Sequence, residues 1–452
     1  MKYLKKILLA VLLFLLFFIL IRGIPREKNG KNEYFAQING QRINVYRTED
    51  AAYLFVPAYA NPDEIVYSEG ALELDTTRMK LSEIPTVFIQ TQTGTMDKIH
   101  ADKDYMESGK ITIYDLDGSI AYFDGLQYIK GHGNYSWNNE MWRKKPYKIS
   151  FKDGSGYTLI ANASDPTLLR NHIGRELETV LRIPYANEGD FVSLYINGDY
   201  YGIYYLCKNL DVDRNYYLME REFYDRFALE SDKKKGFMTE DGECFVIVKP
   251  STISEKEIDS LSQRMNEIDE SIRSLKDIDQ NVDMDSFAKR YVVEEVMKNY
   301  DAGISSAYFY LNANIYESKL FYGPGWDYDM SLGNYLDWMS YSEEDATGLT
   351  LGVSEGDVNE WPKLLYENQD FRKLAITNYE EGAKSYLEEL TDSKIQDYAD
   401  LLRNSARADS IRWREMYELC GYEILSDQSI EELTEFITER TAFLDTCWGV
   451  NE

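Results

Sequence analysis

The sequence predicts an α+β fold, with a β-rich N-terminal half and a helical C-terminal half. Alternating aromatic and β-branched residues, typical of half-buried strands, recur from residue 34 to about residue 207. Apolar residues spaced three and four apart, typical of amphipathic helices, dominate from residue 254 to 448. Strands followed by helices, with a mixed segment between them, are the pattern of an α+β body.

The N-terminus begins with three lysines and a continuous apolar run from Ile7 to Ile21, which Arg22 closes. A membrane-spanning helix needs about 20 apolar residues, but flanking cations snorkel and extend the reach of a shorter run. A cleaved secretory signal is the alternative, because its apolar part is of similar length. We expect residues 1–22 to be retained as a single-pass anchor in the cell membrane, with the C-terminal body outside the cytoplasm.

Residues 23–80 are expected to form a polar tether and a small β module, in which Asn39-Gly40 marks a hairpin turn. Residues 81–452 form the main domain, divided into a β-rich part (81–250) and a helical part (251–452). In the β-rich part, Asn197-Gly198 predicts a second hairpin. Asp165-Pro166 is expected to open a helix.

The helical part begins with a capping box, Ser254 with Glu257, followed by an apolar stripe up to Leu275. The stripe favours packing within the chain over a coiled-coil partner, because three heptads are few. A second helix is predicted over 285–298, and further amphipathic helices fill residues 360–448.

The net charge and the spacing of the cysteines argue against two kinds of function, nucleic-acid binding and a zinc knuckle. The formal net charge of −29 argues against a nucleic-acid partner, because phosphate binding needs a basic face. The four cysteines are scattered and form no CxxC pair, so a zinc knuckle is not expected. A disulfide between Cys420 and Cys447 is one reading, and buried free thiols are the other.

The stretch GPGWDYD places Asp327 and Asp329 two positions apart in an aromatic setting, where burial and mutual repulsion raise carboxylate pKa values. A bound cation would remove this repulsion. The expected hairpin between residues 305 and 322 would bring Asp301 close to Asp327. Phosphoryl transfer needs one carboxylate for a hydroxyl proton and another for a divalent metal. The alternative is that these aspartates only cap turns.

A basic counterpart lies upstream, in GHGNYSWNNEMWRKKPYKISF. Arg143, Lys145 and Lys148 are candidates to contact a polyphosphate in this otherwise acidic chain. Lys148 lies within an alternating strand, on the face opposite Tyr147 and Ile149. A solvated lysine on the outer face of the strand is the alternative.

Four stretches together resemble the spore coat protein H (CotH) family of atypical protein kinases. They are GHGNYSW…RKKPYKISF, LLRNHIGRELE…FVSLYINGDYYGIYYL, EEVMKNYDAGISSAYFY and GPGWDYDMSLGN, in this order. The resemblance covers roughly residues 84–335. It implies an atypical protein-kinase-like core that uses ATP and a divalent metal, Mg²⁺ or Mn²⁺, to phosphorylate protein hydroxyls.

The resemblance also implies roles for individual residues. Asp301 is similar to the catalytic-loop aspartate, and Asp327 to the metal-binding aspartate, with Asp329 supporting the ion. Ser306 stands where the spore coat proteins carry an asparagine, a second metal ligand, and Lys208 stands where they carry a glutamate. Lys148 is the expected phosphate-contacting lysine, with Arg143 and Lys145 beside it.

Two functions follow from these observations. The first is a membrane-tethered kinase that transfers the ATP γ-phosphate to Ser or Thr of secreted or envelope proteins, with basic or Ser-rich targets suited to its acidic surface. The second is a non-catalytic, kinase-like surface or coat assembly protein that binds protein or carbohydrate. Asp301 and Asp327 favour the first function, and Ser306 with Lys208 favours the second.

Overall fold

The computed structural model describes residues 34–71, 75–224, 227, 235–299, 305–334, 346–349 and 360–450. The expected anchor, residues 1–22, and the expected catalytic Asp301 lie outside these ranges. In the part of the chain that the structure describes, none of the helices combines the length and hydropathy that a membrane crossing requires.

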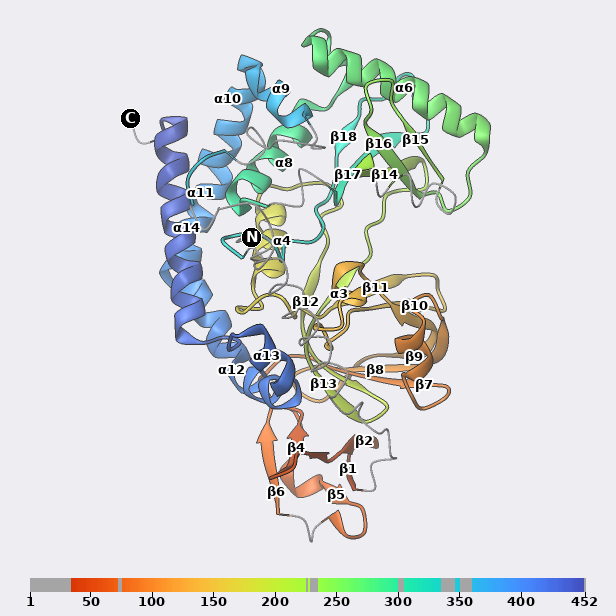
Figure 1. Cartoon of the computed structure of the whole chain (residues 1–452), viewed down its shortest axis with the longest axis vertical. Coiled ribbons are helices and arrows are strands. Elements are labelled where there is room, and N and C mark those ends of the chain that lie inside the picture. The colour runs from red at the N-terminus through yellow and green to blue at the C-terminus, as the bar shows by residue number, and fades with distance from the viewer. Residues whose placement is uncertain are drawn as a thin grey trace, which may run out of the picture.

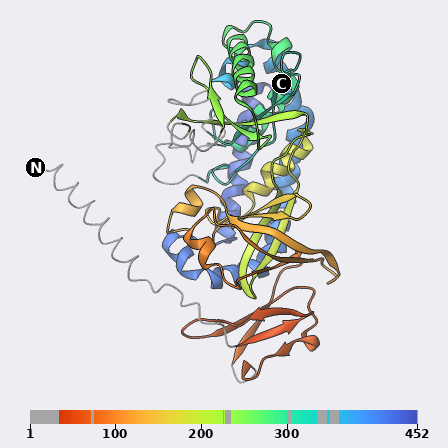
Figure 2. The same ribbon diagram turned by 90° about the vertical axis from the view of Figure 1, so that its right-hand side faces the viewer.

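The chain is elongated, with its sheets stacked along the long axis, the helices of residues 369–448 along one side and the helix of residues 255–274 across one end (Figure 1). Two small sheets lie at one end, a closed barrel lies in the middle, and a second large sheet lies at the other end (Figure 2). The predicted α+β class, with strands concentrated in the N-terminal half and helices in the C-terminal half, is confirmed.

The small sheets, in the orders β2-β1-β5 and β3-β4-β6, are built from residues 35–80. The predicted Asn39-Gly40 hairpin is confirmed, because both residues adopt positive φ (50° and 77°) between β1 and β2. The Tyr195 hydroxyl donates to the Phe55 carbonyl (2.8 Å), which fixes this module to the barrel. The elements are β1 (Phe35–Ile38), β2 (Gln41–Asn44), β3 (Tyr46–Arg47), β4 (Ala52–Val56), η1 (Pro62–Glu64), β5 (Val66–Tyr67) and β6 (Thr76–Lys80).

The barrel closes in the order β10-β11-β13-β12-β7-β8-β9. The second predicted hairpin, at Asn197-Gly198, joins β12 to β13. Closure depends on the parallel pairing of β7 with β12, strands far apart in the sequence. The strands are β7 (Thr86–Thr91), β8 (Glu107–Tyr114), β9 (Ile120–Gly131), β10 (Tyr147–Phe151), β11 (Gly156–Ile160), β12 (Gly189–Ile196) and β13 (Asp199–Lys208), with short helices α2 (Asp97–Ala101) and α3 (Tyr135–Asn138) between them.

Helix α4 (Arg170–Val180) begins later than predicted. Asp165-Pro166 lies in the turn before it, because Leu168 adopts a positive φ of 63° that interrupts helical backbone. The Asp165 carboxylate still serves the helix, since it accepts a hydrogen bond from the backbone N–H of Arg170 (2.9 Å). The helix therefore starts four residues after the expected position.

The second large sheet has the order β15-β16-β14-β17-β18. One of its faces packs Met219, Phe245 and Phe309 into the main core. The other face carries Leu218 and Tyr308 in a smaller cluster directed away from that core. Its strands are β14 (Tyr216–Glu222), β15 (Gly236–Met238), β16 (Cys244–Lys249), β17 (Ala307–Asn312) and β18 (Phe321–Tyr322).

Helices of the C-terminal half cover the barrel and this sheet (Figure 1). The predicted capping box at the start of α6 is confirmed, and the four cysteines are free, so Cys420 and Cys447 are not bonded. The helices are α6 (Glu255–Ser274), α7 (Ile278–Asn281), α8 (Met284–Met297), α9 (Trp361–Glu367), α10 (Gln369–Asn378), η4 (Tyr379–Ala383), α11 (Lys384–Glu389), η5 (Leu390–Lys394), α12 (Ile395–Arg412), α13 (Arg414–Cys420) and α14 (Asp427–Trp448).

Candidate functional site

The loop after β18, residues 323–334, carries the predicted acidic motif and is called the aspartate loop below. A buried carboxylate, Glu178 of α4, fixes its backbone by accepting a hydrogen bond from the Gly325 N–H (2.6 Å). Glu178 also accepts from Arg290 of α8 and from the Tyr328 hydroxyl. A Cβ at position 325 would lie 2.0 Å from these three side chains, so only glycine fits there. The loop is therefore held by two helices.

Asp327 and Asp329 face different groups, although only Tyr328 separates them. Asp327 has a left-handed backbone (φ 66°), and its charge acts on the Tyr308 hydroxyl of the second sheet. The Asp329 carboxylate accepts a hydrogen bond from the Ser164 hydroxyl (2.7 Å), and its charge acts on Tyr422 instead. Asp329 thus holds the loop in place, and the metal role expected for it stays a prediction.

The sheet face beside Asp327 is acidic. Glu220 and Glu222 are two positions apart on β14, so their side chains lie on the same face of the sheet, and Glu222 is only 1% exposed. The Tyr308 hydroxyl donates to the Glu220 carboxylate (2.8 Å). Burial, and then the charges of Glu220, Glu222 and Asp327, raise the pKa of Tyr308 well above its ordinary value. Three carboxylates therefore influence one phenol at this place.

The barrel faces this acidic group with lysines. Lys148 on β10 lies directly opposite Lys130 on β9, an arrangement that is unfavourable for like charges. Partial burial, followed by the charges of Lys130 and Lys249, lowers the pKa of Lys148, whereas Glu220 acts in the opposite direction. Within the described residues, the Lys148 ammonium makes no hydrogen bond or ion pair.

Trp326 connects the two sides. Its ring meets the ring of His132, which follows β9, edge to face at 5.9 Å between centroids. Burial and the charges of Lys148, Lys103 and Lys130 lower the pKa of His132 to about 3, so its ring is neutral. We call this region the junction, defined by Lys148, His132, Glu220, Tyr308, Trp326 and Asp327.

The other predicted basic residues have partners elsewhere. The Lys145 ammonium donates to the carbonyls of Ser136 (3.2 Å), Trp137 (2.6 Å) and Asn139 (3.0 Å), so it holds the α3 turn. Arg143 forms an ion pair with exposed Glu415 (2.7 Å). Lys208 pairs with exposed Glu188 (3.2 Å). Of the predicted basic set, Lys148 is the residue that lies at the junction.

Ser306, the residue before β17, is buried and has a positive φ of 57°. The register pairs Arg221 with Ala307, so Ser306 lies next to the end of the ladder that carries Glu222. The predicted hairpin of β17 and β18 is confirmed by the pairing of Phe309 with Tyr322. Whether it brings Asp301 to Asp327 remains a prediction, because Asp301 is outside the described residues.

The residues at the junction suit a nucleotide with a divalent cation. Within the described ranges, no three His, Cys, Asp or Glu side chains form a group that could hold a metal ion alone. Magnesium, however, takes one or two carboxylates and completes its shell with phosphate oxygens and water. Asp327 with a β14 glutamate could provide such carboxylates, and the Lys148 ammonium could contact a phosphate.

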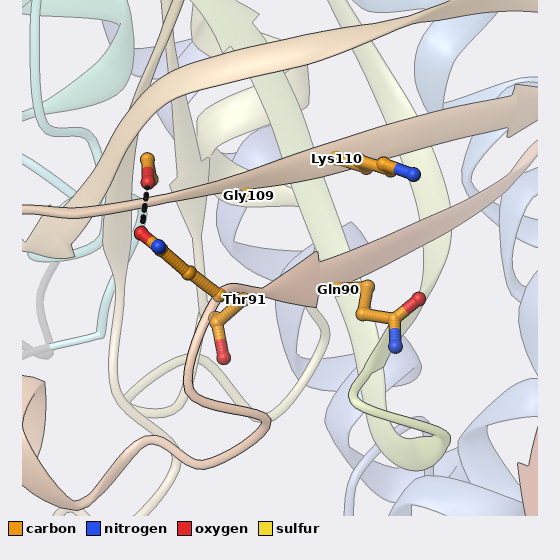
Figure 3. Close-up of a pocket in the computed structure, with 6 residues that line it drawn as sticks. Gln90, Thr91, Gly109 and Lys110 are labelled. Carbon is orange, nitrogen blue, oxygen red and sulfur yellow. Dashed lines mark hydrogen bonds between the residues drawn. The ribbon is translucent and has the colours of Figure 1, made fainter.

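A depression of about 320 Å³ lies elsewhere, on the barrel strands β7 and β8. Its lining includes Gln90, Thr91 and Lys110, and the Ser108 hydroxyl donates to Gln92 across it (2.8 Å). Gln90 and Lys110 pair across β7 and β8, and their side chains extend to the same side in the view (Figure 3). The lining contains no carboxylate, so the depression offers a divalent metal ion no acidic ligand.

Sequence reasoning did not identify Glu220, Glu222, Tyr308 or His132. A signal was available for the glutamates, because YYLMERE places two acids on the same face of an apolar strand. The pairing of β14 with β17, which adds Tyr308, depends on strands almost 90 residues apart and has no local signature.

Comparison with known proteins agrees with the earlier resemblance. Residues 129–444, most of the chain, match the family described as CotH kinase protein. The match begins within β9 and ends within α14, so it contains Lys148, Glu220, Tyr308 and Asp327. A search of curated proteins finds no match to this chain.

Proposed function

Because the chain belongs to the CotH kinase family, we propose that it is a phosphotransferase that binds ATP with Mg²⁺ or Mn²⁺ at the junction. The γ-phosphate goes to Ser or Thr hydroxyls of secreted or envelope proteins. The membrane anchor at residues 1–22 and a basic or Ser-rich target belong to the same proposal.

The observation that carries this proposal is the opposition of charges at the junction. Lys148 is half-buried, faces another lysine across the ladder, and has no hydrogen-bond partner within the described residues. An anion would offset both the burial and the repulsion. On the other side, Glu220, Glu222 and Asp327 gather around Tyr308 and would be stabilised by a cation. A metal-bound triphosphate supplies an anion for Lys148 and a cation for the carboxylates.

Each residue has a role in this proposal. Lys148 binds phosphate oxygens, and Asp327 with a β14 glutamate holds the metal. The metal, when bound, neutralises charge on the phosphates during transfer. Asp301 is proposed to accept the proton of the target hydroxyl. Glu178 and Arg290 position Asp327 by fixing the aspartate loop.

The test is an assay of phosphate transfer by the full chain, with γ-labelled ATP and Mn²⁺ or Mg²⁺. The protein itself and a basic, Ser-rich peptide are the two acceptor substrates. We expect label on Ser or Thr with the wild type and about a hundredfold less with Asp327→Asn, which keeps the shape but loses the charge. Asp153→Asn is the matched control, because Asp153 lies in an exposed turn, where it accepts a hydrogen bond from the Ser155 hydroxyl (2.6 Å).

Absent or equal incorporation in the wild type and Asp327→Asn would contradict the transferase proposal. In that case the chain would be the non-catalytic binding or assembly protein that its sequence left open.

A further inference from the structure

Arg175 of α4 is a buried charge without hydrogen bonds. Its side chain is almost fully enclosed, the residue being 2% exposed, and none of its guanidinium nitrogens has a hydrogen-bond partner within the described residues. No ion pair of Arg175 is found there either. A buried, unsatisfied guanidinium is costly, because it loses water without replacing its hydrogen bonds. Such a group in a folded protein calls for an explanation, and binding of an anion is one.

Aromatic rings cover the guanidinium on two sides. Its central carbon lies 5.0 Å from the centre of the Trp326 ring and 5.8 Å from that of Tyr205 on β13. These cation–π contacts offset part of the cost of burial, but they use none of the five N–H donors. Trp326 is the same residue that meets His132 at the junction. Arg175 therefore lies directly behind the ring that borders the proposed nucleotide site.

The barrel register connects Arg175 with Lys148. Lys148 lies opposite Thr158, and Thr158 lies opposite Cys207, so the three side chains form a row on one face of β10, β11 and β13. Cys207 is also close enough to Arg175 for the two groups to interact electrostatically. Two strand steps of about 4.8 Å each separate the ends of the row. Lys148 and Arg175 thus lie near the two ends of one row of side chains, whose other members, Thr158 and Cys207, are buried.

The backbone around Trp326 is fixed while its side chain is only partly buried. Gly325 is held by Glu178, and the Tyr328 N–H donates to the Asn171 side chain (3.1 Å). The Trp326 ring, which contacts both His132 and Arg175, therefore stands between Arg175 and the junction. The planar guanidinium binds two phosphate oxygens at once, which suits it to a nucleotide phosphate.

We infer that Arg175 is a second phosphate-binding residue of the junction, reached when the Trp326 side chain turns away from the guanidinium. The inference rests on the proposed nucleotide site and extends it from Lys148 to the opposite end of the row. Trp326 then acts as the cover of the Arg175 site.

The test compares binding of Mn²⁺–ATP and of adenosine to the full chain by calorimetry, in the wild type, Arg175→Lys and Arg175→Met. We expect both variants to lose about tenfold or more in ATP affinity. Lysine lacks the planar guanidinium that binds two phosphate oxygens at once, and methionine lacks the positive charge. Adenosine affinity should not change. Arg372→Lys is the matched control, since Arg372 also stacks on an aromatic ring, Tyr366 at 4.9 Å, but lies on α10.

Thermal unfolding without nucleotide separates binding from a structural role. If Arg175 is an unsatisfied charge kept for a ligand, Arg175→Met should unfold at or above the wild-type temperature. A lower unfolding temperature together with equal losses for ATP and adenosine would assign Arg175 to structure alone and overturn the inference. Wild-type-like ATP affinity in both variants would also overturn it. That result leaves the proposed function intact, whereas no ATP binding by the wild type removes both.

Discussion

Lys148 lies opposite Lys130 on the neighbouring strand, and the Lys130 ammonium already pairs with exposed Asp104 (3.1 Å). For Lys148, the carboxylate whose charge acts on its ammonium is Glu220 of the junction. Local composition gave Arg143, Lys145 and Lys148 as candidates for a polyphosphate contact, and the family resemblance singled out Lys148. Composition alone could not separate the three, because the partners of Arg143 and Lys145, Glu415 and the α3 carbonyls, are set by tertiary structure.

Replacing Lys148 by methionine should lower Mn²⁺–ATP affinity by about tenfold to a hundredfold, because one charge-assisted contact is lost. Stability should stay the same or rise, since the repulsion with Lys130 disappears. Calorimetric titration and thermal unfolding measure the two effects. Lys110→Met, on the barrel depression of β8, is the control and should leave ATP affinity unchanged. Loss of affinity in the Lys110 variant alone would place the nucleotide at that depression instead.

His132 gives a prediction on pH. Its pKa is lowered to about 3 in the folded protein by burial and nearby lysines, against an ordinary value of 6.5. Below pH 6.5 the unfolded chain therefore binds a proton that the folded chain does not, and stability falls by up to about 1.4 kcal/mol per pH unit between pH 6 and 4. His132→Gln should reduce this fall in urea unfolding measured across that range. Identical pH profiles would show that His132 is not buried as a neutral ring.

At the scale of elements, α4 and the aspartate loop form one unit. Sequence predicted both segments, and the capping box correctly placed the start of α6. The start of α4 was predicted wrongly, because the positive φ of Leu168 is imposed by its burial in the core rather than by local preference. The carboxylate that links α4 to the loop, Glu178, lies on a helix face that sequence assigned to no function.

Glu178→Gln should disturb the aspartate loop more than the rest of the fold. The change removes the charge that Arg290 faces and weakens the acceptor of the Gly325 N–H, and breaking a buried pair costs about 3–5 kcal/mol. We expect lower stability in urea unfolding and loss of phosphate transfer together. Glu176→Gln, on the same helix but hydrogen-bonded to Tyr398 (2.8 Å), is the control and should spare transfer. Equal loss of transfer in both variants would argue against a positioning role of Glu178.

At the scale of the whole molecule, a buried ion pair fixes the helical half to the barrel. Lys144, which precedes β10, and Asp409 of α12 are fully buried and lie 2.6 Å apart. Asp409 also accepts from the Ile203 N–H (2.7 Å) and the Tyr417 hydroxyl (2.8 Å). The sequence predicted the two halves but not this contact or the closure of the barrel, because both join residues far apart in the chain.

Lys144→Met should cost about 3–5 kcal/mol of unfolding free energy, because it leaves the Asp409 charge buried without its cation. The neighbouring Arg143→Met should cost about 0–1 kcal/mol, since the Arg143–Glu415 pair is exposed. Urea unfolding of both variants measures the difference. Equal, small effects would mean that the barrel and the helices are held together without this ion pair.

The central claim is that Lys148 and Asp327 bind the same metal-bound triphosphate. A crystal structure of the full chain with Mn²⁺ and a non-hydrolysable ATP analogue tests it most directly, because manganese can be located by its anomalous signal. The account predicts manganese within about 2.2 Å of an Asp327 oxygen, a distance typical of hard cations with carboxylates, and a phosphate oxygen in hydrogen-bond contact with Lys148. Manganese and triphosphate bound elsewhere, or Lys148 and Asp327 both turned away from them, would contradict it.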